Sequence, residues 1–408
     1  MHSFAKRLTS PFKYNCTIIS FIAFLVISSC STRTIFNEQY VTGKIQEQAG
    51  LDTSSALSGP LDIPGDIVLS DGISLDEANE IALWKNPKLQ ADMADLGFAR
   101  ADLLDAGMLP NPALSLLFPI GPKQLEFTFS YAIDVLWQRP GCISAARLNV
   151  EKTANNLVRN GLSLIREVSV AYADLIQAEG ELEVYNEQAS GDREVARIAG
   201  TRLNIGDISS LEEMAFRLES SRSDEAALNA KKELENRKAR FFGLLGLVDQ
   251  KDKLEITVED PVLVNLPDTG VLIANALAAR PDFRAAEIEV EISADRLGWE
   301  RSKIISLTAL LDANAQGKEG FEMGPGMQLA IPLFNFNQGG TRRARAMMQK
   351  AAAGYLATEQ NIYEELLISH NEYTTACELY WSLAENMLPV SEKALESAEK
   401  SWIAGEIS

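Results

Sequence analysis

One segment of the chain alternates strictly between apolar and polar side chains. From Leu125 to Val135, large apolar residues occupy every odd position, whereas the even positions are small, hydroxylated or acidic. A period of two predicts a β-strand with one apolar and one polar face. The pattern suits either a half-buried strand of a soluble sheet or a strand of an outer-membrane barrel, which needs about 9–11 residues.

Three further segments extend this pattern into two β-hairpins. Residues 113–118 form a short strand flanked by prolines, so the first hairpin is predicted over 113–136. Residues 305–313 alternate in the same way, and a turn at 317–320 leads to another alternating segment, so the second hairpin is predicted over 304–334. Each hairpin should present one apolar and one polar face.

Long helices follow both hairpins. Over 158–185 the apolar positions are three or four residues apart, with a mean spacing close to the coiled-coil period of about 3.5. We expect a long helix pair over 141–247 that reverses at Gly206. A second long helix is expected over 339–404, with a kink at Pro389.

Two shorter helices are predicted before the first hairpin. Ser74 precedes the first of them, and Glu77 three residues later completes a capping box. This helix should end near Asn86, and a second should run to about Met108, where prolines stop it.

The chain is an internal duplication. Residues 82–89 return in altered form as 276–283, and 206–209 return as 405–408. Such a repeat predicts one elongated body built from two similar halves. The first copy continues to Leu247 beyond its Gly-Asp-Ile-Ser, whereas the second stops at that point. We therefore expect the chain to lack its last helix and to function poorly as it stands.

The N-terminus has the features of a targeting segment. Basic residues precede an apolar stretch too short for a transmembrane helix, which predicts a signal peptide over 1–29. The sequence before Cys30 resembles a bacterial lipobox, so Cys30 is the predicted lipidation site, and Ser31 favours the outer membrane. An ordinary signal peptide with an incidental cysteine is the alternative. Residues 30–72 are polar and aperiodic, which predicts an extended, lipidated tether.

Composition excludes several classes of function. The net charge of -19 argues against nucleic acid as a partner. The sequence shows no phosphate-binding loop, nucleophile elbow or metal-ligand spacing, so we expect no catalytic residues, no metal site and no cofactor. His370 lies in a polar stretch and is interpreted as solvated. Cys142 and Cys377 are placed too far apart along the helices for a disulfide, so two free thiols are predicted.

Several short motifs occur in a fixed order across both copies. They are Leu75-Asp76-Glu77-Ala78 with Asn86-Pro87, Pro110-Asn111-Pro112, Leu244-Leu245-Gly246, Arg280-Pro281-Asp282, Ile331-Pro332-Leu333-Phe334 before Gly339-Gly340, and Leu388-Pro389 leading to Gly405. Together they make the chain resemble the TolC-type outer-membrane efflux family. With the lipobox, the resemblance is strongest to the outer components of resistance–nodulation–division pumps, with the heavy-metal branch among the candidates.

The resemblance implies a mainly α fold with a β-barrel portion. Three copies would form a homotrimer with a twelve-stranded barrel in outer-membrane lipid and an α-helical tunnel in the periplasm. The first repeat would cover 73–268, and the truncated second repeat 269–408. The partners implied are a periplasmic adaptor (membrane fusion) protein and an inner-membrane pump.

Two groups of site residues follow from the resemblance and the strand pattern. The turn between the long helices matches the adaptor-contact tip of the family, and its residues are Arg202, Leu203, Gly206, Asp207, Ile208 and Ser209, with Gly405 and Glu406 from the second copy. A plain helix cap and helix start is the simpler interpretation of this turn. The carboxylates at even strand positions are expected to face the lumen and favour cations, and they are Glu126, Asp134 and Asp312. Simple hydration of a wet wall is the alternative.

The predicted function is therefore a passive, lipid-anchored exit duct in the outer membrane. The alternatives are an exit duct for type I protein secretion and a structural, non-spanning periplasmic coiled-coil lipoprotein. The hairpins separate the last alternative from the others, because a structural protein must bury their apolar positions against protein.

Overall fold

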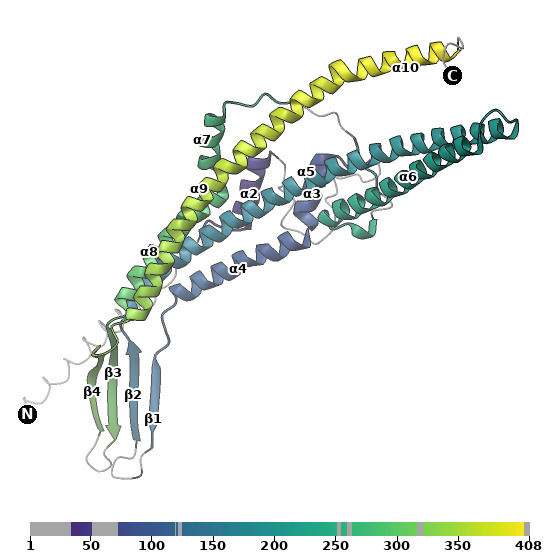
Figure 1. Cartoon of the computed structure of the whole chain (residues 1–408). Coiled ribbons are helices and arrows are strands. Elements are labelled where there is room, and N and C mark those ends of the chain that lie inside the picture. The colour runs from purple at the N-terminus through teal and green to yellow at the C-terminus, as the bar shows by residue number, and fades with distance from the viewer. Residues whose placement is uncertain are drawn as a thin grey trace, which may run out of the picture.

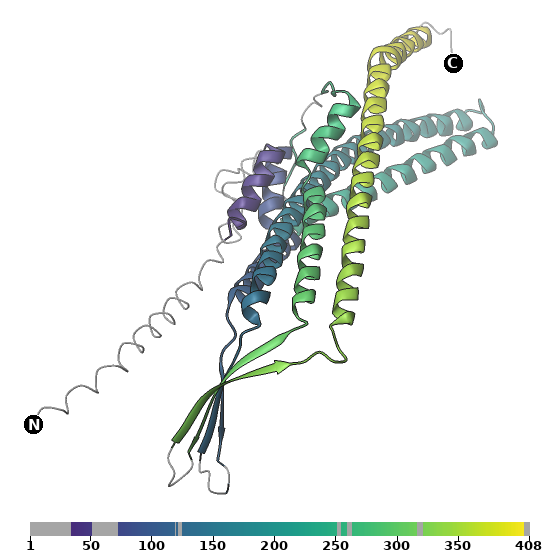
Figure 2. The same ribbon diagram turned by 90° about the vertical axis from the view of Figure 1, so that its left-hand side faces the viewer.

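Strands and helices occupy opposite ends of an elongated molecule (Figure 1). The structure is a computed structural model that describes residues 34–50, 72–118, 120, 125–250, 254–258, 263–315 and 321–403. Within these residues, one small sheet projects from the base of a bundle of long helices, as both views show (Figure 1 and Figure 2).

The sheet contains four antiparallel strands in the order β1-β2-β3-β4. β1 (Ala113–Leu117) pairs with β2 (Leu125–Ala132), and β3 (Ser306–Ala315) pairs with β4 (Phe321–Ala330). Both predicted hairpins are therefore present, although the turn at 317–320 lies outside the described residues. The central pairing of β2 with β3 joins the two repeats of the chain in a single sheet.

β2 ends earlier than the alternation predicted. The expected strand reached Val135, but the ladder stops at Ala132. The backbone N–H groups of Ile133 and Asp134 both donate to the carbonyl oxygen of Leu307, at 2.8 and 3.2 Å, and the chain then turns into a helix. Two donors on one acceptor cannot continue a regular ladder, so the strand ends here. β4 also ends before its predicted boundary.

The two short helices match their predicted bounds. α3 (Leu75–Lys85) begins with the expected capping box, in which the Ser74 hydroxyl accepts the Glu77 N–H and the Glu77 carboxylate accepts the Ser74 N–H. α4 (Pro87–Gly107) is capped by Asn86, whose side-chain oxygen accepts two backbone N–H groups at 3.0 Å each. These side chains satisfy donors that a helix start leaves unpaired.

The prediction of an extended tether is wrong for the described part of 30–72. This part forms a helix, α2 (Glu38–Ala49), which is capped by the side chain of Asn37. Val41 and Ile45 lie one turn apart and are fully buried against the bundle. Two apolar residues on one helix face are too few to give a clear periodic signal, but they suffice to dock a short helix. The lipidation site predicted at Cys30 lies outside the described residues.

The long helix pair reaches further than predicted. α5 (Val135–Asn204) contains 70 residues and includes Pro140 near its start. At about 1.5 Å per residue, it spans about 105 Å. Gly206, with a φ of 76°, reverses the chain, and α6 (Ser210–Leu244) returns beside α5 before a short turn, η1 (Val248–Gln250). Both views show α6 beside the part of α5 that leads to the tip (Figure 1 and Figure 2).

The second repeat follows the same plan. α7 (Thr269–Ala279) and α8 (Pro281–Ser302) precede its hairpin. After the hairpin, one helical path runs through α9 (Gln338–Trp381), the π-helical turn η3 (Ser382–Met387) and α10 (Leu388–Ile403). The path as a whole corresponds to the long helix predicted over 339–404.

The interruption in this path lies beside Pro389, as predicted. Proline has no N–H to donate to the carbonyl four residues earlier, and its ring clashes with that turn. The preceding turn is widened, and the N–H of Leu388 donates to the carbonyl of Leu383. A π-helical turn of this kind is a recognised cause of helix bending. The helix bends between α9 and α10 in Figure 2.

Most of the core lies in the first repeat. Buried apolar side chains from α2, α3, α4, α5 and the end of α6 form one cluster, whose largest fully buried members are Phe241, Phe242, Ile45, Ile73, Ile81, Leu83, Leu96, Leu103, Leu175 and Leu245. A smaller apolar contact joins α8 to α9, where the rings of Phe283 and Tyr355 are 4.9 Å apart. None of the described helices is both long enough and apolar enough to cross a membrane.

Candidate functional site: the two-faced sheet, the helical tip and the seam between repeats

The strand register sorts the side chains of all four strands onto two faces. Phe127 aligns with Leu116 on one side and with Ala313 on the other, and Ala313 aligns with Met323. The neighbouring residue of β2, Glu126, aligns with Asn314 of β3, which aligns with Glu322 of β4. This row of aligned residues is therefore polar on β2, β3 and β4. The alternation seen in the sequence of β2 therefore continues into β3 and β4 at these positions, whereas β1 places Leu117 opposite Glu126.

The apolar face of the sheet is uncovered. Its exposed members come from β1, β2 and β4, and they are Leu114, Leu116, Phe129, Met323, Met327 and Leu329. Met327, for example, is 74% exposed. The described helices lie beyond one end of the sheet rather than over either face (Figure 1 and Figure 2). A contiguous exposed apolar surface of this kind marks contact with lipid or with another protein.

The opposite face carries acidic and amide side chains. The Thr128 hydroxyl donates to the Asp312 carboxylate at 2.8 Å, and the Asn314 amide donates to the same carboxylate at 3.1 Å. Glu126 and Glu322 align with Asn314 from opposite sides. Sequence reasoning placed Glu126 and Asp312 on this face but missed Glu322. Its even position in an alternating segment was the signal that could have identified it.

Asp134 does not belong to this face. It precedes the first residue of α5, and the Gln138 side chain donates to its carboxylate at 3.4 Å. Asp134 therefore lies just beyond the strand on which it was predicted, because β2 ends two residues earlier, at Ala132.

The helical tip is a tight turn that is stabilised by backbone hydrogen bonds and an ion pair. The N–H of Gly206 donates to the carbonyl of Leu203, and the N–H of Asp207 donates to the carbonyl of Arg202, both at 2.9 Å. Across this turn, Arg202 Nε lies 2.6 Å from Asp207 Oδ2. The positive φ of Gly206 is a conformation that side chains with a Cβ rarely adopt, which fits the glycine to this position.

The start of α6 completes the tip. Ser209 and Glu212 form a second capping box, and the backbone and hydroxyl hydrogen bonds of Ser209 lower the pKa of the Glu212 carboxyl. Ile205 and Leu211 are 76% and 78% exposed at the same end. Sequence reasoning did not select these two apolar side chains, although Ile205 directly follows the last residue of α5 and Leu211 lies in the first turn of α6, at the end of the helix pair where exposure is expected. Gly405 and Glu406 lie outside the described residues.

Ion pairs join the two repeats along α5 and α8. Lys152 pairs with Glu289, and Arg284 pairs with Glu151, with N–O distances of 2.9 Å in both cases. These four side chains come from helices on opposite sides of the boundary between the repeats, so we call this contact the α5–α8 seam.

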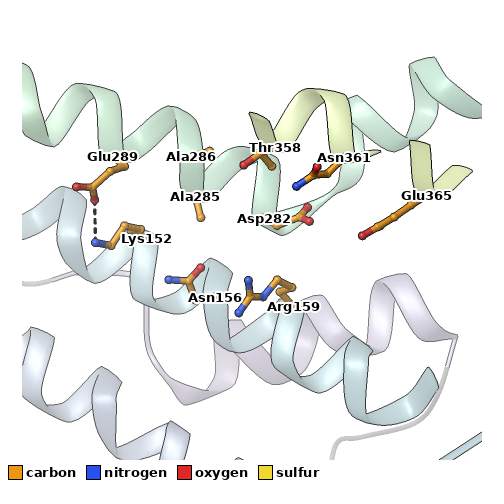
Figure 3. A pocket seen from close by; sticks show the side chains of 10 residues that line it. All are labelled: Lys152, Asn156, Arg159, Asp282, Ala285, Ala286, Glu289, Thr358, Asn361 and Glu365. Atoms are coloured by element: carbon orange, nitrogen blue, oxygen red, sulfur yellow. Dashed lines mark hydrogen bonds and ion pairs between the residues drawn. The ribbon is translucent and has the colours of Figure 1, made fainter. Parts of the chain in front are cut away.

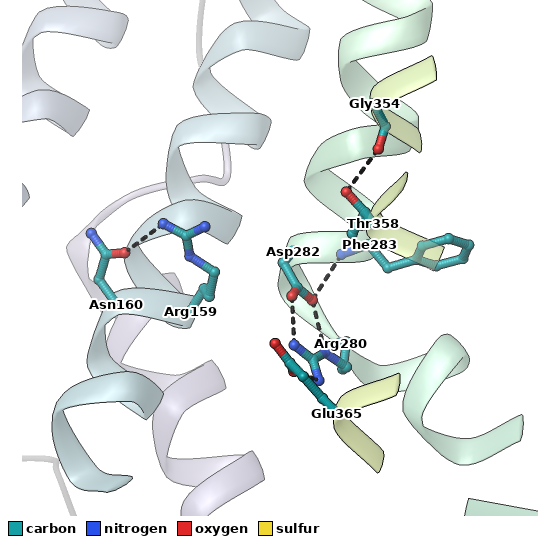
Figure 4. Close-up of polar contacts among 8 residues, drawn as sticks. All are labelled: Arg159, Asn160, Arg280, Asp282, Phe283, Gly354, Thr358 and Glu365. Atoms are coloured by element: carbon teal, nitrogen blue, oxygen red, sulfur yellow. Dashed lines mark hydrogen bonds and ion pairs between the residues drawn. The ribbon is translucent and has the colours of Figure 1, made fainter. Parts of the chain in front are cut away.

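A three-residue network lies at one end of the seam. Arg280 pairs with Asp282 at 2.7 Å and with Glu365 of α9 at 2.8 Å (Figure 4). Burial favours the neutral form of Asp282, but hydrogen bonds and charge from Arg280 outweigh that effect and lower the pKa of Asp282. The same bonds, led by those to Asp282, raise the pKa of Arg280. A cleft of about 410 Å³ opens beside this network, between α5, α8 and α9 (Figure 3).

Little else in the described part of the chain suggests chemistry. Among the described residues, no three His, Cys, Asp or Glu side chains gather as a metal site would require. Cys142 and Cys377 are free thiols, as predicted.

Known proteins match this architecture over most of its length. No family model matches the chain. The cobalt-zinc-cadmium resistance protein CzcC of Cupriavidus metallidurans is 23% identical over 348 residues, which cover 82% of this chain and 81% of CzcC. The outer-membrane protein VceC of Vibrio cholerae superposes with a TM-score of 0.64 at 19% identity, covering 81% of this chain and 86% of VceC. The chain is a homologue of CzcC with the TolC-type fold. CusC, whose structures concern transmembrane channel formation, gives a TM-score of 0.62 at 18% identity and covers 82% of this chain and 83% of CusC.

These likenesses confirm the predicted fold class. The mainly helical body with a small antiparallel sheet is the fold that the chain shares with VceC and CusC. The assignment of individual site residues rests on the geometry described above, because similarity at this level of identity concerns the fold.

Proposed function

We propose that this protein is the outer-membrane exit duct of a tripartite efflux system and conducts small molecules or metal ions passively. The observation that carries the proposal is the register of the sheet, which places exposed apolar side chains on one face and acidic ones on the other. An apolar face suits lipid, and a polar face suits a water-filled lumen. The similarity to CzcC and to outer-membrane channels supports the same role.

The duct is formed by a homotrimer in this proposal. A four-stranded sheet leaves β1 and β4 as open edges, whose unpaired backbone groups are not tolerated in hydrocarbon. Joining β1 of one copy to β4 of the next removes the edges. Three copies give a barrel of about twelve strands, within the usual range for outer-membrane barrels.

The other partners are assigned to the two ends of the molecule. The tip around Arg202 and Gly206 contacts a periplasmic adaptor, where exposed Ile205 and Leu211 supply apolar contact area beside the charged pair. Energy and cargo choice come from an inner-membrane pump. An acylated Cys30 adds a lipid anchor to the barrel.

Divalent metal ions are the cargo class that we favour. CzcC is by name a cobalt-zinc-cadmium resistance protein. The polar face of the sheet here carries Glu126, Asp312 and Glu322, and rings of carboxylates favour cations in pores. A protein-secretion duct or a structural lipoprotein has no comparable support from the acidic face.

Conductance tests the proposal directly. The full chain is reconstituted in planar lipid bilayers, and the reversal potential is measured in a salt gradient. We expect a cation-selective pore whose selectivity falls when Glu126→Gln and Asp312→Asn are combined. Glu38→Gln, which removes an exposed carboxylate of α2 outside the sheet, serves as the matched control. A sample that produces no pore and stays in the aqueous phase would support the structural alternative.

Crosslinking tests the tip separately. Arg202→Cys, labelled with a photoreactive reagent in intact cells that carry the whole pump, should capture the adaptor. Glu187→Cys, an exposed position on α5 away from the tip, should not. Equal capture from both positions, or from neither, would contradict adaptor contact at the tip.

A further inference from the structure

The α5–α8 seam follows a heptad register. α5 and α8 run antiparallel, so a step up one helix corresponds to a step down the other (Figure 1). Moving one heptad of about seven residues from Lys152 leads to Arg159, and the same step back from Glu289 leads to Asp282. The spacing therefore places a second cation opposite a second carboxylate, in line with the Lys152–Glu289 pair.

We call each such ion pair between α5 and α8 a rung of the seam. The second rung, between Arg159 and Asp282, is not formed in the structure. Asp282 instead accepts two hydrogen bonds from Arg280, at 3.0 and 2.7 Å. Arg159 donates to the side chain of its neighbour Asn160 at 3.1 Å. Figure 4 shows Arg159 on α5 and Asp282 on α8 on opposite sides of a gap between the helices.

The cleft of about 410 Å³ occupies the place of the missing rung. Figure 3 shows Lys152 and Glu289 at one end of the cleft, and Arg159, Asp282 and Glu365 toward the other. The hollow arises because α8 contributes only small side chains, Ala285 and Ala286, between its two carboxylates. The other side chains that line the cleft are polar, so water can fill the cleft while it is open. When the walls approach, these side chains can form hydrogen bonds with one another.

We propose that Arg159 and Asp282 form a further inter-repeat ion pair in a second state of the seam, in which the cleft is closed. In that state Asp282 exchanges the guanidinium of Arg280 for that of Arg159, and Arg280 keeps Glu365 of α9. No charge is gained or lost in the exchange. Arg280 and Asp282 are each partly exposed to solvent, which weakens their ion pair relative to a fully buried one.

The exchange moves helices rather than single side chains. Asp282 lies in the first turn of α8, and Arg280 connects that turn to α9 through Glu365. Closing the rung therefore draws the α8–α9 pair toward α5. The effect of this movement on the width of the duct rests on the proposed function, whereas the pairing of Arg159 with Asp282 does not.

Zero-length crosslinking tests the pairing. A carbodiimide joins an amine to a carboxylate only when the two are in contact, and the wild-type Lys152–Glu289 pair provides an internal positive control. In the full-length Arg159→Lys protein we expect a second link, to Asp282, identified by mass spectrometry. Adding Arg280→Gln, which releases Asp282, should raise the yield of this link at least twofold. Adding Asp282→Asn should abolish it.

The outcomes separate the alternatives. A link at 152–289 with none at 159–282, in both Arg159→Lys and its Arg280→Gln derivative, overturns the proposal. A link from position 159 to Glu365 instead overturns the heptad register. Should Arg159→Lys lose the control link, the double variant Arg159→Cys with Asp282→Cys, in a background lacking Cys142 and Cys377, decides the question. A Cα separation that suits an arginine–aspartate ion pair is too long for a disulfide. A short bifunctional thiol reagent that spans the length of such a pair should then join the two cysteines, and failure to join them refutes the closed state. None of these readouts depends on conduction, so a failed duct and a failed ion pair remain distinguishable.

Discussion

Replacing Ile45 with alanine should release α2 from the helix bundle. Ile45 is 1% exposed, and Val41 is the other buried residue of this helix. α2 has only 12 residues, and an isolated helix of that length is marginal in water. The helix therefore depends on the contacts that these two side chains make with the core beside α5.

The size of the effect follows from the burial and from the shape of the site. Truncating a buried isoleucine to alanine costs about 2–5 kcal/mol. Ile45 also fills the space above Gly161, where an added Cβ would lie 2.5 Å from Ile45 Cδ1. Since about 1.4 kcal/mol is a factor of ten, the undocked population should rise by about 30-fold or more.

Hydrogen exchange of the full-length protein in lipid nanodiscs measures this population. Peptides covering 38–49 should lose protection in Ile45→Ala, while the hairpins and α8 stay unchanged. Ile35→Ala provides a control of identical chemistry, because Ile35 precedes the helix and is 76% exposed. Equal protection of α2 in the two variants would refute the argument that burial of Ile45 holds this helix.

Three further predictions concern other contacts. The Tyr373 hydroxyl accepts a hydrogen bond from the N–H of Val264 and donates one to its carbonyl, both at 2.7 Å. Tyr373→Phe removes the bond to that amide, worth about 0.5–1.5 kcal/mol, and should speed its hydrogen exchange by about 2–12-fold. An unchanged exchange rate would show that other contacts hold the segment around Val264. The folded start of α6 lowers the pKa of Glu212 below its ordinary value of 4.5. The backbone amides at the start of α6 should therefore be fully protected from hydrogen exchange above that pH, and the protection should be lost as the pH falls below it. Glu212→Gln should abolish this pH dependence, and a variant that still titrates would contradict the assignment. Gly180→Ala, with open space around the added methyl group, should raise the thermal midpoint through about 1 kcal/mol of helix propensity, whereas Gly161→Ala should not; equal gains would contradict the contact with α2.

Local signals in the sequence account for most of the correct predictions. The alternation in β2, the capping box at Ser74 and the reversal at Gly206 each depend on residues within a few positions of one another. Pro389 likewise acts on its own turn. Such features are set by backbone geometry and hydrogen bonding, so they are visible without knowledge of the tertiary fold.

The features that sequence reasoning missed depend on distant contacts. β2 ends at Ala132 because its next amides bond Leu307, which lies in the other repeat. α2 forms because Val41 and Ile45 find a docking site on α5, which composition does not reveal. The predictions therefore failed where a structural feature depends on a residue that is distant in the sequence.

The central claim is that the sheet is a piece of a membrane barrel with lipid on one face and water on the other. Cysteines introduced singly at Phe127, Thr128, Phe129 and Ser130, in a background lacking Cys142 and Cys377, test it in native outer membranes. Accessibility to a membrane-impermeant thiol reagent should alternate, with Thr128→Cys and Ser130→Cys labelled and the two phenylalanine positions protected and accessible only to a lipid-dissolved reagent. Uniform labelling of all four positions from water would contradict the account.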